Sequence, residues 1–247
     1  MADANGDGFS MGAVLSRTAS SIGRNIAALG ALAALMLAPG LLTGYALDAP
    51  TPEAVAAGAA TGGYWLATTL SSLVMFLVAC AAMKLAVADA RGEDAGLVPA
   101  LKTGLARFFP LLVLSLVYYV CFAFGLVLLI VPGVFLMTMW VLIGPVAVVE
   151  DGGMMASFGR SRFLTKGHRW AVFGLIMIAV VAYALVLAPL MVNIAALADI
   201  GFAARLALQT GSAAITLAGC VMVAALYIEL VAAKEGPGQA ELEQVFA

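Results

Sequence analysis

Charged residues are scarce in this chain. Only 11% of its 247 residues are Asp, Glu, Lys or Arg, whereas 64% are hydrophobic and the mean hydropathy is +1.09. A soluble domain is usually about a quarter charged and about half apolar. A soluble core of this length could not hide so much apolar surface, so the composition argues against a soluble enzyme and indicates a chain solvated by lipid.

Cysteine and histidine are also rare. The three cysteines, Cys80, Cys121 and Cys220, all lie in apolar runs, and the sequence has no C-x-x-C pair or Cys/His cluster. Buried free cysteine packs as a small hydrophobe, so neither a disulfide framework nor a zinc site is expected. The single histidine, His168, belongs to no E-x-x-H motif. We therefore expect no metal, no cofactor, no enzymatic activity and no nucleic-acid partner.

Six apolar runs approach or exceed the roughly 20 residues that a helix needs to cross a bilayer. No charged residue lies in the middle of any run, and Glu229 is one turn from an end. The expected fold class is therefore all-α, a polytopic membrane protein with six transmembrane helices arranged as three hairpins. The predicted spans are residues 26–47, 64–87, 109–131, 134–149, 170–197 and 206–231.

The third and fourth runs are short for two crossings. They are joined only by Val131 to Gly133, and residues 109–149 make about 60 Å of helix at roughly 1.5 Å per residue. Two crossings of a hydrocarbon core of about 30 Å would use all of it. This hairpin either just spans the membrane or enters it as a wedge.

The positive charges are unevenly distributed between the connections. Eleven of the twelve Lys and Arg residues fall in the N-terminal segment, the second and fourth connections and the tail; Arg205 is the exception. Such an excess is typical of cytoplasmic loops, so we expect a bacterial inner-membrane protein with both termini in the cytoplasm. The first 25 residues lack the short apolar core of a signal peptide, so the first helix is expected to be an uncleaved anchor. The expected divisions are a cytoplasmic amphipathic segment (1–25), a transmembrane domain (26–233) and a short cytoplasmic tail (234–247).

A basic segment precedes each odd-numbered run, at residues 11–25, 97–109 and 154–170. In the second segment apolar residues recur at spacings of three and four from Val98 to Phe108, while Lys102 and Arg107 lie off that face. We predict interfacial helices whose apolar faces enter the lipid and whose cations bind anionic headgroups. The predicted headgroup-binding residues are Arg17, Arg24, Lys102, Arg107, Arg160, Arg162, Lys166 and Arg169.

The fourth run and the basic segment after it resemble a known family. Residues 131–153, VPGVFLMTMWVLIGPVAVVEDGG, and residues 161–175, SRFLTKGHRWAVFGL, are similar to the bacterial membrane-domain family named after the membrane part of glycerophosphoryl diester phosphodiesterases, with related YciC-like inner-membrane proteins. The resemblance implies the six-span membrane module alone, without the soluble catalytic barrel. The matching residues are Pro132, Gly133, Trp140, Pro145, Glu150, Ser161, Leu164, Thr165, Gly167 and Trp170.

The end of the last run resembles the same family. Tyr227, Glu229 and Leu230 fit the family's pattern of an aromatic residue before an acidic residue and Leu. Val231 stands where the family usually has Arg. A salt bridge made by that Arg in relatives therefore cannot be carried over to this chain.

Glu150 ends the fourth run and Glu229 nearly ends the sixth, on the expected cytoplasmic side. Arg160, Arg162 and Lys166 lie in the same layer. One hypothesis is that the two carboxylates pair with these cations and lock the last two hairpins together. The alternative is that all of these charges are solvated.

Two further features have competing interpretations. Gly40 and Gly44 form a GxxxG pattern, which lets helices approach closely but also arises by chance in a chain with 26 glycines. His168 could act as a general base, but no G-x-S-x-G motif or recognisable acid partner accompanies it. An interfacial histidine among cations is the favoured interpretation.

These observations favour a non-enzymatic membrane protein that organises lipid or partner proteins at the cytoplasmic leaflet, with anionic lipids as its expected partners. One alternative is a small lipid or solute transporter. Transporters usually carry ionisable groups at mid-membrane depth, which this chain lacks, but Pro39, Pro145 and Pro189 could break helices. The other alternative is an accessory subunit of a larger membrane complex, and a homo-oligomer is also compatible with the sequence.

Overall fold

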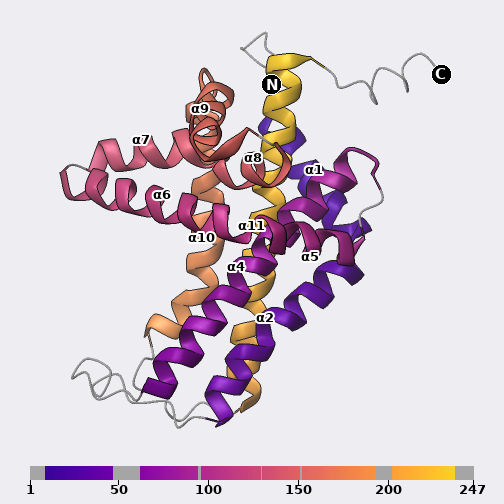
Figure 1. The fold of residues 1–247 in the computed structure, drawn as a ribbon, viewed down its shortest axis with the longest axis vertical. Helices are drawn as coiled ribbons and strands as arrows, with labels where there is room; N and C mark the ends of the chain where they lie inside the picture. Colours follow the sequence, from indigo (N-terminus) through magenta and orange to yellow (C-terminus); the bar gives the residue numbers. More distant parts are fainter. Residues whose placement is uncertain are drawn as a thin grey trace.

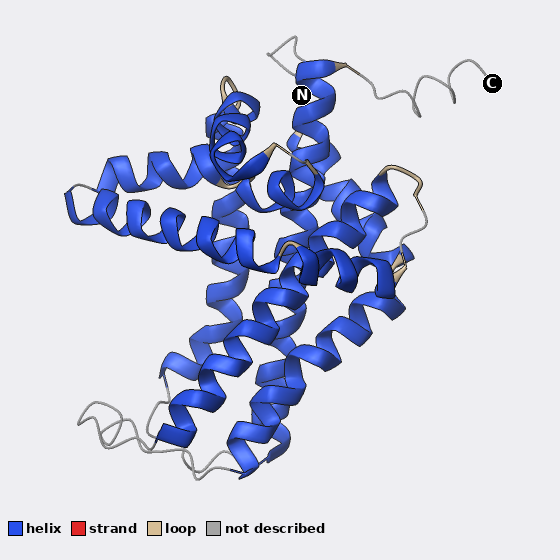
Figure 2. Cartoon of the chain, viewed as in Figure 1, coloured by secondary structure: helices blue, strands red, loops and turns tan. Residues whose placement is uncertain are grey.

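A computed structural model describes residues 9–46, 62–93, 96–128, 130–150, 152–192 and 202–236. All regular structure in these ranges is helical, and they contain no strand (Figure 2). The all-α fold class is confirmed. The helices are α1 (Met11–Arg24), α2 (Ile26–Ala46), α4 (Gly62–Ala90), α5 (Leu97–Ala106), α6 (Phe108–Leu128), α7 (Ile130–Trp140), α8 (Ile143–Val149), α9 (Gly153–Thr165), α10 (Arg169–Val192) and α11 (Phe202–Glu235).

Helices α2, α4, α10 and α11 run along the long axis of the molecule and form its central bundle (Figure 1). Helix α11 contacts the other three, and α2 packs against α4. Their facing side chains are apolar: Leu32, Leu85, Leu175 and Leu226 come from the four helices and are fully buried in one cluster. The apolar runs therefore pack against one another as one unit.

Several of these helices are long and apolar enough to cross a membrane. Among the described residues, Gly62–Ala90, Phe108–Gly125 and Gln209–Glu235 qualify singly, and the number rises from three to five if each bent helix pair is one span. The bent pairs are α1 with α2 and α9 with α10. The chain is therefore a membrane protein, but the predicted count of six spans is not confirmed.

Helices α6 and α7 form a hairpin that lies across the bundle instead of along it (Figure 1). The two helices approach closely, because a Cβ added at Gly125 would lie only 3.0 Å from the Cα of Gly133. The predicted third and fourth spans thus differ in direction from the helices of the bundle. This arrangement matches the wedge alternative better than two full crossings.

The predicted fourth span, residues 134–149, is divided between two short helices. Helix α7 ends at Trp140 and α8 begins at Ile143. Pro145 lies in the first turn of α8, where its missing N–H is not needed. In a continuous helix its ring would clash with the carbonyl of Val141, which explains why the helix breaks there.

Sharp bends separate the first and third basic segments from the bundle. The bend between α1 and α2 is 83°, and the bend between α9 and α10 is 103°. Gly167 lies in the second bend with a φ of +96°, a conformation that would strain any residue with a β-carbon. These bends place α1 and α9 near the end of the bundle where α4 and α11 finish (Figure 1). We call this the basic end.

Helix α5 packs on α4 through small residues. Ala100 and Gly104 are buried, and a Cβ at Gly104 would lie 3.3 Å from the carbonyl oxygen of Leu77. Val98 and Leu105, from the predicted apolar face, are 60% and 67% exposed. These two residues are open to lipid, as an interfacial helix requires, whereas Leu101 of the same face packs against the core.

Candidate functional site: the ionic network at the basic end

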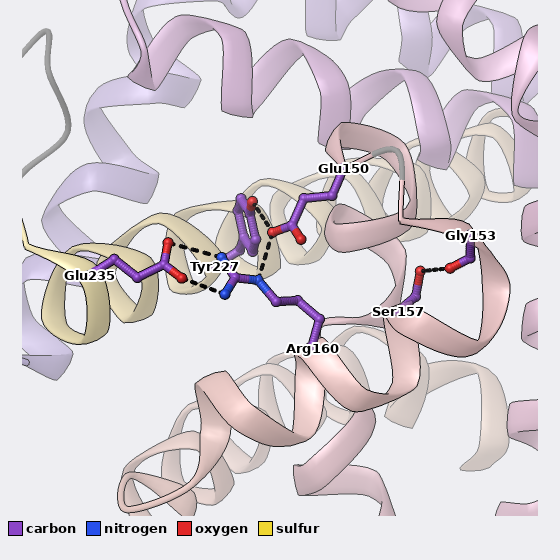
Figure 3. A network of polar contacts seen from close by, with 6 residues as sticks. All are labelled: Glu150, Gly153, Ser157, Arg160, Tyr227 and Glu235. Carbon is purple, nitrogen blue, oxygen red and sulfur yellow. Dashed lines mark hydrogen bonds and ion pairs between the residues drawn. The ribbon is translucent and has the colours of Figure 1, made fainter.

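Arg160 on α9 joins three parts of the basic end (Figure 3). Its Nε donates to Oε1 of Glu150 at 3.0 Å, and its Nη2 donates to Oε2 of Glu235 at 3.0 Å. Its Nη1 makes a second contact with Glu235. Glu150 follows α8 and Glu235 ends α11, so one guanidinium ties α8, α9 and α11 together. Two-pronged Arg–carboxylate contacts of this kind are among the stronger hydrogen-bonded pairs.

Tyr227 completes the network from inside α11. Its side chain is buried, and its hydroxyl donates to Oε1 of Glu150 at 2.8 Å. Ser157, one turn before Arg160, donates its hydroxyl to the Gly153 carbonyl at 3.0 Å (Figure 3). That hydroxyl is therefore engaged within its own helix.

A pocket of about 500 Å³ opens beside this network. Glu150, Arg160 and Glu235 line it, with small and apolar residues of α9. The hydrogen bonds and charges of Glu235 and Glu150 raise the pKa of the Arg160 guanidinium, so it stays charged. The cation lining this pocket is already neutralised from within the protein, which leaves little attraction for an external anion.

Two more ion pairs hold α1 to the bundle. Nε of Arg17 lies 2.8 Å from Oε1 of Glu229 on α11. Nε and Nη2 of Arg24 bind the two carboxylate oxygens of Asp89, at the end of α4, at 3.0 and 2.8 Å. Both carboxylates are largely shielded, with 11% of each side chain exposed. Such shielding strengthens the attraction between the charges, so α1 is fixed at its middle and at its C-terminal end.

The ion-pair partners differ in part from the sequence hypothesis. Glu150 contacts Arg160, as proposed, but Glu229 contacts Arg17 and not a cation of the fourth connection. The network therefore fastens the N-terminal segment as well as the last two hairpins. It also gives Glu229 a partner even though Val231 stands where an arginine is expected from the family resemblance.

Sequence reasoning missed Asp89, Glu235 and the role of the Tyr227 hydroxyl. Asp89 closes α4 and Glu235 closes α11, each at the boundary between an apolar run and a polar segment. An acidic residue at such a boundary, on the side rich in Lys and Arg, was the available signal. Its partner could not be chosen from the sequence, because Arg24 is 65 residues from Asp89 and Arg160 is 75 from Glu235.

The eight predicted headgroup-binding cations fall into three groups. Arg17, Arg24 and Arg160 are engaged in the ion pairs described above. Lys102, Arg162 and Lys166 are exposed, and Arg107 and Arg169 are half-buried. Headgroup binding stays a prediction for all of them.

Several residues that carry the family resemblance hold α7 against α9. The Ser161 hydroxyl donates to the Met139 carbonyl at 2.9 Å. The Thr165 hydroxyl donates to the Ser161 carbonyl at 3.0 Å, and it also lies 3.3 Å from the Met139 carbonyl oxygen. Met139 is in the last turn of α7, where carbonyls lack partners within the helix. Leu164, between the two hydroxyls, is completely buried. These positions therefore have a structural role in this fold.

His168 also packs inside the protein. It is 5% exposed, and its ring centre lies 4.9 Å from that of Phe9. Its backbone N–H donates to the Thr165 carbonyl at 3.2 Å. Gly40 and Gly44 lie in α2, but their surroundings are outside the described residues. Close helix packing at these two glycines stays a prediction.

Within the described ranges, no group of three or more His, Cys, Asp or Glu residues could hold a metal ion. Comparison with family models, with curated proteins and with solved structures finds no match. The interpretation of the basic end therefore depends on its geometry.

Proposed function

We propose that this chain is a non-enzymatic protein of a bacterial inner membrane, related to the phosphodiesterase membrane-domain family, that organises lipid or partner proteins at the cytoplasmic leaflet. The α6–α7 hairpin carries the proposal. It lies across the bundle and contacts α9, toward the basic end (Figure 1). Its surface presents aromatic side chains: Phe109, Tyr119 and Phe124 are 73%, 63% and 66% exposed.

Exposed aromatic residues on a transverse hairpin need an apolar environment. An aromatic side chain buries about 150–250 Å², and burial of apolar surface stabilises by roughly 25 cal/mol per Å². Because roughly two thirds of each side chain is exposed, each of these residues gains about 2.5–4 kcal/mol by entering acyl chains. With α1, α5 and α9 in the headgroup layer, the hairpin adds volume to a single leaflet, which favours curvature of the membrane.

The transporter alternative has less support. It requires that prolines break the spanning helices, because transporters bind substrate at backbone groups that such breaks expose. Helix α2 continues through Pro39 and α10 continues through Pro189. Pro145 does break a helix, but it does so at the start of the short helix α8, which follows the transverse α6–α7 hairpin. Counterflow of a labelled solute in proteoliposomes would nevertheless revive this alternative.

The position of the hairpin can be measured by cysteine labelling. The native cysteines are first replaced by alanine, and Leu128→Cys is introduced at the last residue of α6. A wedge keeps this position within the bilayer, so a membrane-impermeant maleimide added outside spheroplasts should not label it. Ala57→Cys, expected outside, and Ala240→Cys, expected in the cytoplasm, are the positive and negative controls. Labelling of Leu128→Cys as strong as that of Ala57→Cys would show that the hairpin spans the membrane.

The organising role is tested with purified protein and vesicles. We expect stronger association with phosphatidylcholine vesicles that contain phosphatidylglycerol than with phosphatidylcholine alone, and smaller or tubulated vesicles by cryo-electron microscopy. The Phe109→Ala/Tyr119→Ala/Phe124→Ala variant should lose the shape change. The control is Ile178→Ala/Val181→Ala/Leu185→Ala, which removes exposed side chains of α10. A wild-type protein that neither prefers anionic vesicles nor changes their shape contradicts the proposal.

A further inference from the structure

A second hollow, of about 730 Å³, lies between α7 and the bend that joins α9 to α10. We call it the lipid groove and define it by Phe135 on α7, Lys166 and Gly167 in the bend, and Arg169, Trp170 and Phe173 at the start of α10. A phospholipid has a compact anionic headgroup and long apolar chains. The lining of the groove likewise combines cations, which suit the headgroup, with aromatic side chains, which suit the acyl chains. We call the part near the cations its mouth and the aromatic part its walls.

The mouth of the groove is positively charged. Lys166 is exposed and Arg169 is half-buried, and the residues that line the groove include no carboxylate. Lys234 adds a third cation nearby, because its Nζ lies 3.7 Å from the position that a Cβ would take at Gly167. This local excess of positive charge attracts an anion.

Arg169 has an unused donor in this region. Its Nε is buried and has no hydrogen-bond partner within the described part of the chain. Its guanidinium carbon lies 4.4 Å from the centre of the Phe135 ring, so a cation–π contact holds the side chain against the wall of the groove. A buried charged donor without an acceptor costs about 1–3 kcal/mol or more, so the Arg169 guanidinium favours a negative charge near it.

Helix α10 reinforces the preference for an anion. It begins at Arg169 and has 24 residues, so the free N–H groups of its first turn and its dipole favour negative charge at this end. Lys166, Arg169 and the start of α10 therefore belong to the lining of the same groove.

The walls of the groove are aromatic and face outward. Trp170 is 87% exposed and Phe135 is 46% exposed, while Phe173 lies one turn further along α10 and is half-buried. A free phosphate or a soluble anion would leave these rings in water. An acyl chain would cover them, and Trp is a residue that favours the boundary between headgroups and chains.

We propose that the lipid groove binds one anionic phospholipid, with its phosphate at Lys166 and Arg169 and an acyl chain along Phe135, Trp170 and Phe173. This inference rests on the proposed function, which places the basic end at an anionic leaflet. It goes further, because it replaces a diffuse attraction with one site of defined stoichiometry.

The test is native mass spectrometry of the whole protein, released from detergent and titrated with phosphatidylglycerol. Wild type should retain one lipid tightly, and Lys166→Ala/Arg169→Ala should bind it about tenfold or more weakly, since each cation near an anionic lipid contributes about 1 kcal/mol. The control is Lys102→Ala/Arg162→Ala, which removes two exposed cations outside the groove. It should keep the one-lipid adduct. If the double variant in the groove does not fold, Lys166→Ala alone should weaken the lipid by severalfold.

A second measurement reports the acyl chain. In Trp65→Phe/Trp140→Phe, Trp170 is the remaining tryptophan, and phosphatidylglycerol with brominated chains should quench it more than brominated phosphatidylcholine at the same mole fraction. Equal quenching by both lipids, or displacement of the lipid by millimolar inorganic phosphate, would show an unselective surface or a phosphate site.

The two proposals fail in distinguishable ways. If wild type prefers anionic vesicles but Lys166→Ala/Arg169→Ala keeps its bound lipid within twofold of wild type, the groove inference is wrong and the proposed function stands. If wild type shows no preference for anionic vesicles at all, the proposed function fails first. Equal loss of lipid in the groove variant and the Lys102→Ala/Arg162→Ala control would mean that general charge, and not the groove, binds the lipid.

Discussion

Arg160 and the pair Lys166 and Arg169 lie within ten residues of sequence, yet they have opposite surroundings. Arg160 is bound on both sides by Glu150 and Glu235 at 3.0 Å. Lys166 and Arg169 line the lipid groove, which includes no carboxylate among its lining residues. Positive charges beside a membrane helix therefore belong to at least two classes. Cations of the first class join helices through carboxylates, and those of the second class remain able to bind a molecule from outside the protein.

The bend at Gly167 separates the two classes. Arg160 lies inside α9, on the side that meets the end of α11. Lys166 caps α9, and after Gly167 turns the chain through a positive φ, Arg169 begins α10 beside α7. The same basic stretch is thereby divided between Arg160, which two carboxylates neutralise, and a groove that Lys166 and Arg169 line without a carboxylate.

The largest expected effect on stability comes from Arg160→Ala. The substitution leaves Glu150 and Glu235 close together without their shared cation, so the free energy of unfolding should fall by about 1–3 kcal/mol. We expect the lower part of that range, because 25% of the Arg160 side chain and 43% of the Glu235 side chain are exposed. Thermal unfolding in a mild detergent measures the change.

Arg162→Ala is the matched control for this substitution. It removes the same charge from the same helix at an exposed position, so the expected change is within about 0.5 kcal/mol. Arg160→Lys should recover only part of the loss, because an ammonium cannot reproduce the two-pronged contact with Glu235. Equal destabilisation by Arg160→Ala and Arg162→Ala would remove the distinction between the two classes of cation.

The positions of most helices could be predicted from the sequence. The predicted runs 26–47, 64–87 and 206–231 correspond to α2, α4 and α11, with ends displaced by a few residues. Hydropathy over some 20 residues is a strong signal, since lipid-facing helices must be apolar nearly all round. The separation of basic and apolar segments was equally visible, and it located the end of the molecule where the ionic network and the lipid groove lie.

The direction of the α6–α7 hairpin and the identities of the ion-pair partners could not be predicted. Hydropathy measures how well a helix suits lipid, and it is the same for a transverse helix as for a crossing one. Glu229 offered a carboxylate to any cation at the basic end, and the packing of α1 against α11 selected Arg17. The different surroundings of Arg160 and Arg169 also come from the tertiary packing. It brings the carboxylate of Glu235, which is distant in sequence, to Arg160, and it places Arg169 in a groove whose lining residues include no carboxylate.

The smallest expected effect on stability is that of Lys166→Ala in detergent without phospholipid. The side chain is exposed and its loss should change the free energy of unfolding by less than about 0.5 kcal/mol. Added phosphatidylglycerol should then stabilise wild type, since a ligand at a hundred times its dissociation constant contributes about 2.7 kcal/mol, and should stabilise Lys166→Ala less at the same concentration. Arg160→Ala should show the reverse pattern, with low stability in detergent and a full gain from the lipid. Thermal unfolding of the three proteins across a lipid titration measures both the stability in detergent and the stabilisation by lipid. If the lipid stabilises wild type and Lys166→Ala equally, this lysine neither cross-links helices nor binds lipid.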